Sequence, residues 1–94
     1  MAMIKGFHCD DTRSLFQGER VPRWANIDKV ALRKLAMLNA AGALADLRVP
    51  PGNRLEALVG DRAGQHSIRV NDQWRVCFIW TESGPEGVEI VDYH

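Results

Sequence analysis

The stretch HSIRVNDQWRVCFIW, residues 66–80, decides the fold because it places two apolar runs on either side of a polar turn. Both runs are rich in the β-branched and aromatic residues that are enriched in strands, and the polar residues 71–73 are typical of a turn. A three-residue turn keeps the apolar side chains on one face of the hairpin, whereas a two-residue turn would split them between faces. We therefore predict an antiparallel hairpin whose buried face carries Ile68, Val70, Trp74, Val76, Phe78 and Trp80.

The same register places Arg69 directly opposite Arg75. Like charges that face each other across two strands destabilise a sheet. Two interpretations stay open. Either both guanidinium groups extend into water or pair with Asp61, Glu82 or Glu89, or an anion such as a phosphate lies between them and receives forked, charge-assisted hydrogen bonds.

The chain beyond the hairpin predicts one more strand. Residues 81–87, TESGPEG, are typical of a turn, and residues 88–91 return as an apolar strand before the final Asp92, Tyr93 and His94. Burying a carboxylate without a partner is costly, so we expect the strand to leave the core before Asp92. The last three residues are either a frayed end or a group of functional side chains.

The residues before the hairpin predict a strand and a first helix. Residues 3–8 are expected to form a short strand. Asp10 and Asp11 then offer an N-cap for a helix that stops at Gly18, and residues 17–23 form a polar loop.

A second helix is expected to begin at Asn26, which can cap it, because four apolar residues follow at helical spacing: Ile27, Ala31, Leu35 and Leu38. We interpret its charged face as a solvated helix surface rather than an RNA-binding surface; this face carries Lys29, Arg33 and Lys34. Residues 48–54, RVPPGNR, are expected to end all helix because Pro50 and Pro51 lack backbone donors.

These elements predict a single α+β domain over residues 3–94, a compact β-α-α-β-β-β fold with two helices packed on one face of an antiparallel sheet. A chain of 94 residues has room for one core. Met3 is expected to be the natural start, after an added Met1 and Ala2. A short chain with no apolar leader or spanning segment is expected in the cytoplasm rather than in a membrane.

The charge balance excludes a generally cationic coat for nucleic acid. The 12 basic and 12 acidic residues give a formal net charge of zero. The second half nevertheless carries a modest positive excess made of arginine, the residue best suited to forked contacts with phosphate: Arg48, Arg54, Arg62, Arg69 and Arg75.

The residues now quoted carry a resemblance to a known family. PPGNRLEALVGDRAGQHSIRVNDQWRVCFIW (residues 50–80), VEIVDYH (88–94) and MIKGF (3–7) resemble the HigB-type toxins of bacterial toxin-antitoxin modules, also called plasmid maintenance system killer proteins. These toxins belong to the RelE/ParE superfamily. The most specific parts are the G-D-R-x-G-Q-x-S-I-R-x-N-D-Q-W-R block and the terminal D-Y-H.

The resemblance implies the compact β-α-α-β-β-β fold and an mRNA endonuclease that cuts messages in the decoding site of translating ribosomes, with no metal and no cofactor. It also implies an antitoxin partner of the HigA type, a helix-turn-helix protein through which the toxin reaches operator DNA. Two further activities of related toxins stay open: a weak or non-cutting toxin that binds ribosomal RNA or a ribosome assembly factor, and a ParE-like poison of DNA gyrase.

The family's terminal acid, phenol and imidazole correspond to Asp92, Tyr93 and His94, and the Arg of its N-D-Q-W-R block corresponds to Arg75. Many relatives carry Lys where this chain has Val59, and some carry His where it has Glu56. Loss of the Lys removes a contact for the scissile phosphate, which makes a weakened nuclease the expectation.

Metal-free RNA cleavage needs a base for the 2′-hydroxyl, cationic donors for the phosphate and an acid for the leaving 5′-oxygen. The terminal carboxylate and Asp92 should favour a protonated His94, which we therefore assign as proton donor or phosphate contact. Glu56 or Asp92 is the candidate base, and Tyr93 can stack on a base of single-stranded RNA. The predicted phosphate-binding residues are Arg54, Arg62, Arg69 and Arg75.

Overall fold

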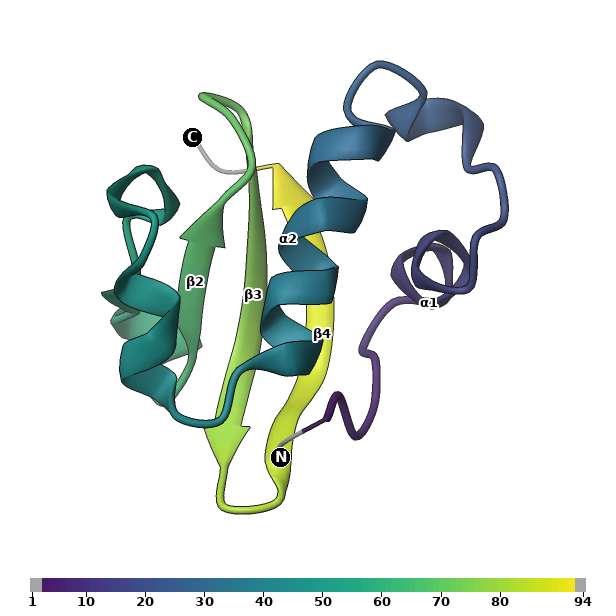
Figure 1. The fold of residues 1–94 in the computed structure, drawn as a ribbon. Helices are drawn as coiled ribbons and strands as arrows, with labels where there is room; N and C mark the ends of the chain where they lie inside the picture. The colour runs from purple at the N-terminus through teal and green to yellow at the C-terminus, as the bar shows by residue number, and fades with distance from the viewer. Residues whose placement is uncertain (1–2, 93–94) are drawn as a thin grey trace.

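The computed structural model describes residues 3–92, which form two helices followed by a four-stranded antiparallel sheet (Figure 1). The helices are α1 (Asp10–Phe16) and α2 (Asp28–Ala40). The strands, in the order β1-β2-β3-β4 across the sheet, are β1 (Glu56–Ala57), β2 (His66–Arg69), β3 (Trp74–Thr81) and β4 (Gly84–Asp92). The predicted α+β class is confirmed.

The predicted hairpin register is also confirmed. Ile68 lies opposite Val76 and Arg69 opposite Arg75. The three-residue turn is closed by the side chain of Asn71, whose Oδ1 accepts hydrogen bonds from the backbone nitrogens of Gln73 and Trp74, both at 2.8 Å. The hairpin therefore presents one apolar face.

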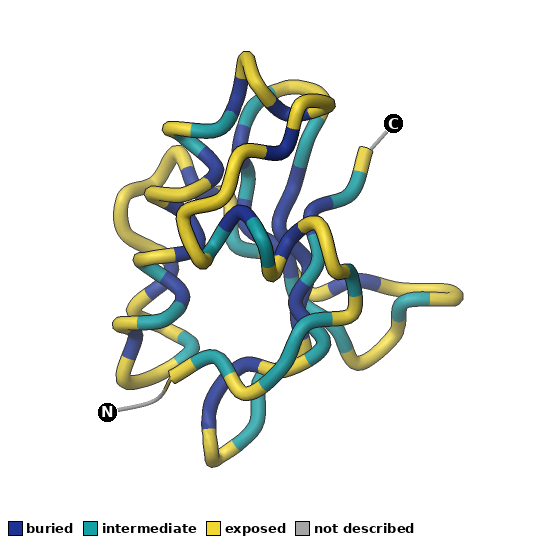
Figure 2. The backbone as a smooth tube through the Cα atoms, turned by 90° about the vertical axis from the view of Figure 1, so that its right-hand side faces the viewer, coloured by how far each residue is buried: buried dark blue, intermediate teal, exposed yellow. Residues whose placement is uncertain are grey.

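Helix α2 covers that face (Figure 1). Its Ala31, Leu35 and Leu38 are fully buried against Val76 and Phe78 in the same core. Figure 2 shows the buried positions recurring along the helix and the strands, while the exposed positions gather in the outer loops. The spacing of apolar residues thus located the core correctly.

Two details of α2 differ from the expectation. The helix begins at Asp28 with Ile27 at its N-cap, because a turn with a hydrogen bond from the Ile27 nitrogen to the Trp24 carbonyl occupies the residues before it, so Asn26 is not the cap. Lys34, expected on the solvated face, is buried. Its amine reaches the side chain of Asn53, which offsets the cost of removing it from water.

The expected strand over residues 3–8 is absent. The segment instead makes an isolated parallel bridge between Phe7 and Val88 at the edge of β4. Strand β4 is bulged there: two of its residues, Gly87 with φ +59° and Val88, face Phe78 of β3. The bulge bends the edge, so the pairing extends over only a few residues.

Four short 3₁₀ helices connect the larger elements: Pro22–Trp24, Leu44–Arg48, Pro51–Asn53 and Gly60–Arg62. The third corrects the prediction that residues 48–54 contain no helix. Pro51 lies at the first position of that turn, where the missing backbone donor would be unpaired anyway.

The last strand is longer than predicted. It begins at Gly84 rather than at Val88, because the turn after Thr81 is tight and the Thr81 hydroxyl donates to the Gly84 carbonyl at 2.7 Å. The strand does leave the core as expected, since Asp92 is exposed. None of the helices described is long and apolar enough to cross a membrane.

Candidate functional site

A row of four polar side chains crosses the sheet on the face opposite α2. Paired strand residues point to the same side of a sheet. Glu56 of β1 pairs with Ser67 of β2, Ser67 with Cys77 of β3, and Cys77 with Glu89 of β4. The row therefore has a carboxylate at each end and two buried neutral groups, Ser67 and Cys77, between them.

Arg75 lies two residues before Cys77 on β3. Its side chain extends toward Ser67 and Glu56, the first half of this row. Its Nε donates to the Ser67 hydroxyl at 2.7 Å and its Nη2 donates to the Arg54 carbonyl at 2.7 Å. Nη2 also lies 3.8 Å from a carboxylate oxygen of Glu56. Only 8% of Arg75 is exposed, and its guanidinium is held in one orientation by a buried and a part-buried acceptor.

The backbone conformation of Arg54 explains why its carbonyl can accept the hydrogen bond from Arg75. Arg54 follows the Pro51–Asn53 turn and adopts left-handed dihedrals, φ +46° and ψ +53°. The turn itself is anchored by Asn53, which is fully buried and donates to the Leu47 carbonyl at 3.2 Å. Lys34 donates to the other end of that amide, at 2.5 Å from Oδ1. Helix α2 is thereby linked to the loop that positions Arg75.

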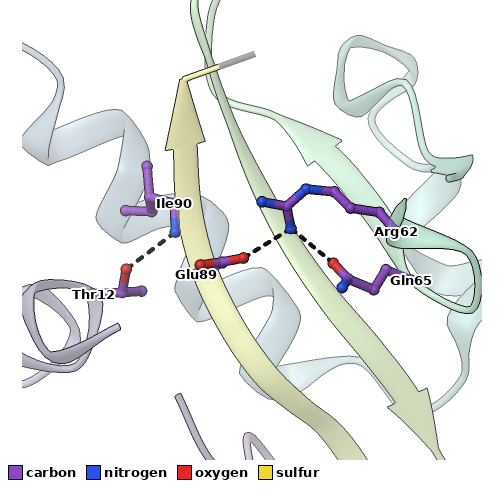
Figure 3. A network of polar contacts seen from close by, with 5 residues as sticks. All are labelled: Thr12, Arg62, Gln65, Glu89 and Ile90. Carbon is purple, nitrogen blue, oxygen red and sulfur yellow. Dashed lines mark hydrogen bonds and ion pairs between the residues drawn. The ribbon is translucent and has the colours of Figure 1, made fainter. Parts of the chain in front are cut away.

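Arg62 contacts Glu89, at the other end of the row. Its Nη1 donates to Glu89 at 2.8 Å and to the side chain of Gln65 at 3.0 Å (Figure 3). The hydrogen bond to Glu89 raises the pKa of Arg62 above its usual value. Figure 3 also shows how β4 is fixed on its other side, where the Ile90 nitrogen donates to the Thr12 hydroxyl of α1 at 3.1 Å.

All four charged groups act on Cys77. Burial raises the pKa of the Cys77 thiol, because the thiolate is poorly solvated there; Arg62 and Arg75 oppose the rise, while Glu89 and Glu56 add to it. The site is thus a compensated arrangement of two carboxylates and two guanidinium groups around a buried thiol. A thiol with a raised pKa is a poor nucleophile.

The opposed Arg69 and Arg75 take separate acceptors. Arg69 forms an ion pair with Asp72 in the hairpin turn, while Arg75 is held by Ser67, Arg54 and Glu56. The acids beside these two arginines in the described residues, Asp72 and Glu56, are therefore different from the predicted Asp61, Glu82 and Glu89.

The predicted site residues lie in three places: beside Arg75, in separate ion pairs, and at the end of β4. Glu56 and Arg75 are brought together with the backbone of Arg54, whose side chain is exposed. Arg62 and Arg69 are engaged with Glu89 and Asp72.

At the end of β4, Asp92 accepts a hydrogen bond from the side chain of Gln73 at 3.1 Å. Tyr93 and His94 lie outside the residues described. Within residues 3–92, no three His, Cys, Asp or Glu side chains gather as a metal site would require.

Four contributing residues were not among the predicted site residues: Lys34, Asn53, Ser67 and Glu89. Burial lowers the pKa of Lys34, and the positive charges of Arg33 and Arg69 lower it further. Lys34 and Asn53 are 19 residues apart and Arg62 and Glu89 are 27 apart, so no local spacing signals either contact. Ser67 alone carried a signal, since its place in the strand pattern puts it on the face of Arg75.

Comparison with known proteins adds a family likeness. A family model described as the RelE-like toxin of type II toxin-antitoxin system HigB matches residues 3–94. A Vibrio cholerae serotype O1 (strain ATCC 39315 / El Tor Inaba N16961) protein called Toxin HigB-1 is 50% identical over 79 residues, which is 84% of this chain and 77% of that protein. An uncharacterized protein of Haemophilus influenzae (strain ATCC 51907 / DSM 11121 / KW20 / Rd) is 44% identical over 54 residues, 57% of this chain and 54% of its own.

Proposed function

Because the chain belongs to the HigB-like family of RelE-like toxins of type II toxin-antitoxin systems, we propose that this toxin is a metal-independent endoribonuclease that cuts mRNA on the ribosome. It acts in the cytoplasm, where cutting messages in the decoding site stops translation and growth. A cognate antitoxin of the helix-turn-helix, HigA type neutralises it, and the toxin reaches operator DNA only through that partner.

The observation that carries the proposal is the contact between Glu56 and Arg75. A half-exposed carboxylate lies 3.8 Å from a guanidinium that one buried and one part-buried acceptor hold in place. A cation fixed in advance stabilises charge that develops in a transition state without a reorganisation cost. The carboxylate beside it is accessible and can accept a proton.

The proposed reaction needs a base, a cationic contact for the phosphate and an acid. Glu56 or Asp92 takes the proton of a 2′-hydroxyl, and the 2′-oxygen attacks the adjacent phosphorus. The new bond to the 2′-oxygen forms as the bond to the 5′-oxygen breaks, which leaves a 2′,3′-cyclic phosphate and a 5′-hydroxyl. Arg75, with Arg54 and Arg69, stabilises the charge on the phosphate, and His94 supplies the proton to the 5′-oxygen. Tyr93 stacks on a neighbouring base.

Mapping RNA 5′ ends after induction tests this function. Wild-type toxin is expected to give discrete cuts in the reading frame, and Arg75→Ala and His94→Ala are expected to abolish them. Arg13→Ala is a matched control, because Arg13 pairs with the exposed Asp10 on α1, at the other side of the sheet from β1. Cutting that survives both site substitutions would overturn the assignment.

A second candidate function, a weak or non-cutting toxin that occupies ribosomal RNA or an assembly factor, is favoured by one observation. Val59, where the resemblance to HigB-type toxins implies Lys, is 84% exposed, and its apolar side chain cannot make a charge-assisted contact with a phosphate. Growth arrest without any new 5′ ends in messages would select this function over the nuclease.

A further inference from the structure

A groove of about 280 Å³ lies between the end of α1 and the beginning of α2. Leu15 of α1 and Leu32 of α2 form its apolar walls. Gly18 ends the first helix with a φ of +91°, and no atom lies within 4 Å of where a side chain would begin there. Pockets for small-molecule ligands are usually larger than this groove, so its size suits one inserted side chain better than a whole ligand.

Leu32 is the leucine of α2 that the core does not use. Leu35 and Leu38 on the same helix are fully buried, whereas 37% of Leu32 is exposed. A single exposed apolar side chain is common on protein surfaces and needs no explanation by itself. Leu32, however, lines the same groove as the buried Leu15. An apolar side chain that enters the groove therefore contacts apolar groups from both helices.

Four charged side chains surround the two leucines. Two are acidic and two are basic: Glu19, Arg20, Asp28 and Lys29. Within residues 3–92, none of these four takes part in an ion pair. Neighbouring charges do pair, Arg13 with Asp10 and Arg23 with Asp11. The rim of the groove thus keeps both signs of charge available for a partner.

The charge of this rim indicates the class of occupant. RNA and anionic membranes bind to surfaces with a surplus of Lys and Arg, and here two carboxylates offset the two cations. A protein segment that carries both signs can pair with all four groups. A toxin of a type II toxin-antitoxin family has such a protein partner, the antitoxin.

We propose that an amphipathic helix of the cognate antitoxin docks in this groove and inserts one large apolar side chain between Leu15 and Leu32. Basic and acidic side chains one helical turn from that anchor pair with the charged rim. This docking rests on the antitoxin partner proposed above and is independent of nuclease activity. Helix α1 packs on α2 and β4, whereas Glu56 belongs to β1 at the opposite edge of the sheet (Figure 1). Docking can therefore be changed without altering the proposed catalytic pair.

Binding of the whole toxin chain to the purified antitoxin, the helix-turn-helix protein encoded beside the toxin gene, tests the apolar anchor. Leu32→Glu places a charge in the groove and should raise the dissociation constant, measured by calorimetry, at least about tenfold. Leu32→Met keeps an apolar side chain and should bind within about threefold of wild type. Ile79→Glu is the matched control, because Ile79 is 38% exposed on β3 and does not line the groove. It should bind like wild type, and urea denaturation verifies that each variant is folded.

A second pair of variants tests the charged rim. Lys29→Glu and Lys5→Glu make the same change of charge at exposed positions, and Lys29 lines the groove while Lys5 does not. Lys29→Glu should weaken binding about threefold to tenfold at low salt and less at high salt, because salt screens exposed charges. Lys5→Glu should leave the affinity unchanged.

The outcomes separate the groove from the proposed function. Binding that survives Leu32→Glu, or that falls equally in Ile79→Glu, would overturn the groove and leave the antitoxin partner standing. No binding by wild-type toxin would remove the partner itself. In cells, antitoxin made at an equal level should prevent growth arrest by wild-type toxin but not by Leu32→Glu. Arrest that antitoxin relieves without any cuts in messages would remove the nuclease and leave the docking intact.

Two other occupants of the groove would also overturn the proposal. Light scattering of the toxin alone detects the first, since a dimer that Leu32→Glu dissociates would assign the groove to a second copy of the chain. Ribosome pelting assays without antitoxin detect the second, since ribosome binding that is lost in Lys29→Glu but kept in Lys5→Glu would assign the rim to ribosomal RNA.

Discussion

The two faces of the sheet are buried by different means. The face under α2 is closed by apolar packing, where Ile68, Val76 and Phe78 lie fully buried. The opposite face is closed by charged groups, because Arg75 and Arg62 reach across it to buried and half-buried acceptors. Alternation along β3 separates the two sets, since residues 76 and 78 point one way and residues 75 and 77 the other.

The difference between the two faces indicates which face can carry out chemistry. Apolar packing stabilises the fold by removing surface from water and has no preferred direction. The charged face is directional: each guanidinium is fixed by acceptors at stated distances, and losing one leaves the other group unpaired. Substitutions on the first face should therefore change stability, while those on the second should change stability and activity together.

The largest effect on stability is expected from Phe78→Ala on the apolar face. Removing a fully buried ring should lower the free energy of unfolding by about 3–5 kcal/mol, through lost burial and the cavity that remains. Urea denaturation measures it. A loss below about 1 kcal/mol would show that the core can collapse around the site, and the contrast between the faces would weaken.

Arg75→Ala on the charged face should have a smaller effect on stability, about 2–3 kcal/mol, because it leaves the Ser67 hydroxyl and the Arg54 carbonyl without their charged donor. Activity should fall much further than stability explains. Toxicity measured at a temperature where the variant is fully folded separates the two losses. A folded variant that still arrests growth would place Arg75 among the structural residues.

The sequence predicted the apolar face better than the charged one, for a physical reason. Turn length and alternation fix the strand register, so the positions of Ile68 opposite Val76 and Arg69 opposite Arg75 follow from local residues. The partners of Arg75 come from a loop whose position depends on Asn53 and Lys34. Such contacts join segments distant in sequence, and no periodicity encodes them.

Lys34→Met tests the link between the apolar helix and the charged face. It should cost about 1–2 kcal/mol, since the buried Asn53 oxygen loses its donor. The pH dependence has a definite sign. The pKa of Lys34 is lowered in the folded state from 10.5. As the pH rises through this lowered pKa toward 10.5, the unfolded chain binds more protons than the folded one, so wild type gains stability relative to the variant.

Urea denaturation of both proteins near neutral pH and at alkaline pH below 10.5 measures that gap. It should widen at the higher pH. Lys29→Met, at an exposed position of the same helix, should show no comparable widening. A gap between wild type and Lys34→Met that stays constant with pH would mean that the buried amine makes no net contribution through its protonation.

The smallest effect on stability is expected from Val59→Lys, which introduces the cation that the resemblance to HigB-type toxins implies at this position. Val59 is 84% exposed, so the free energy of unfolding should change by less than about 0.5 kcal/mol. If the proposed nuclease function holds, an added cation at residue 59 should nevertheless speed cutting, because charge-assisted contacts are strongest where charge accumulates.

Rates of message cutting at equal toxin levels measure the gain, with Val49→Lys, 72% exposed in the wild type, as a control for added charge. Faster cutting in Val59→Lys alone would show that the wild-type charged face lacks a cation that promotes cutting. Equal rates in all three proteins would show that Arg75 and its neighbours provide enough positive charge for the reaction.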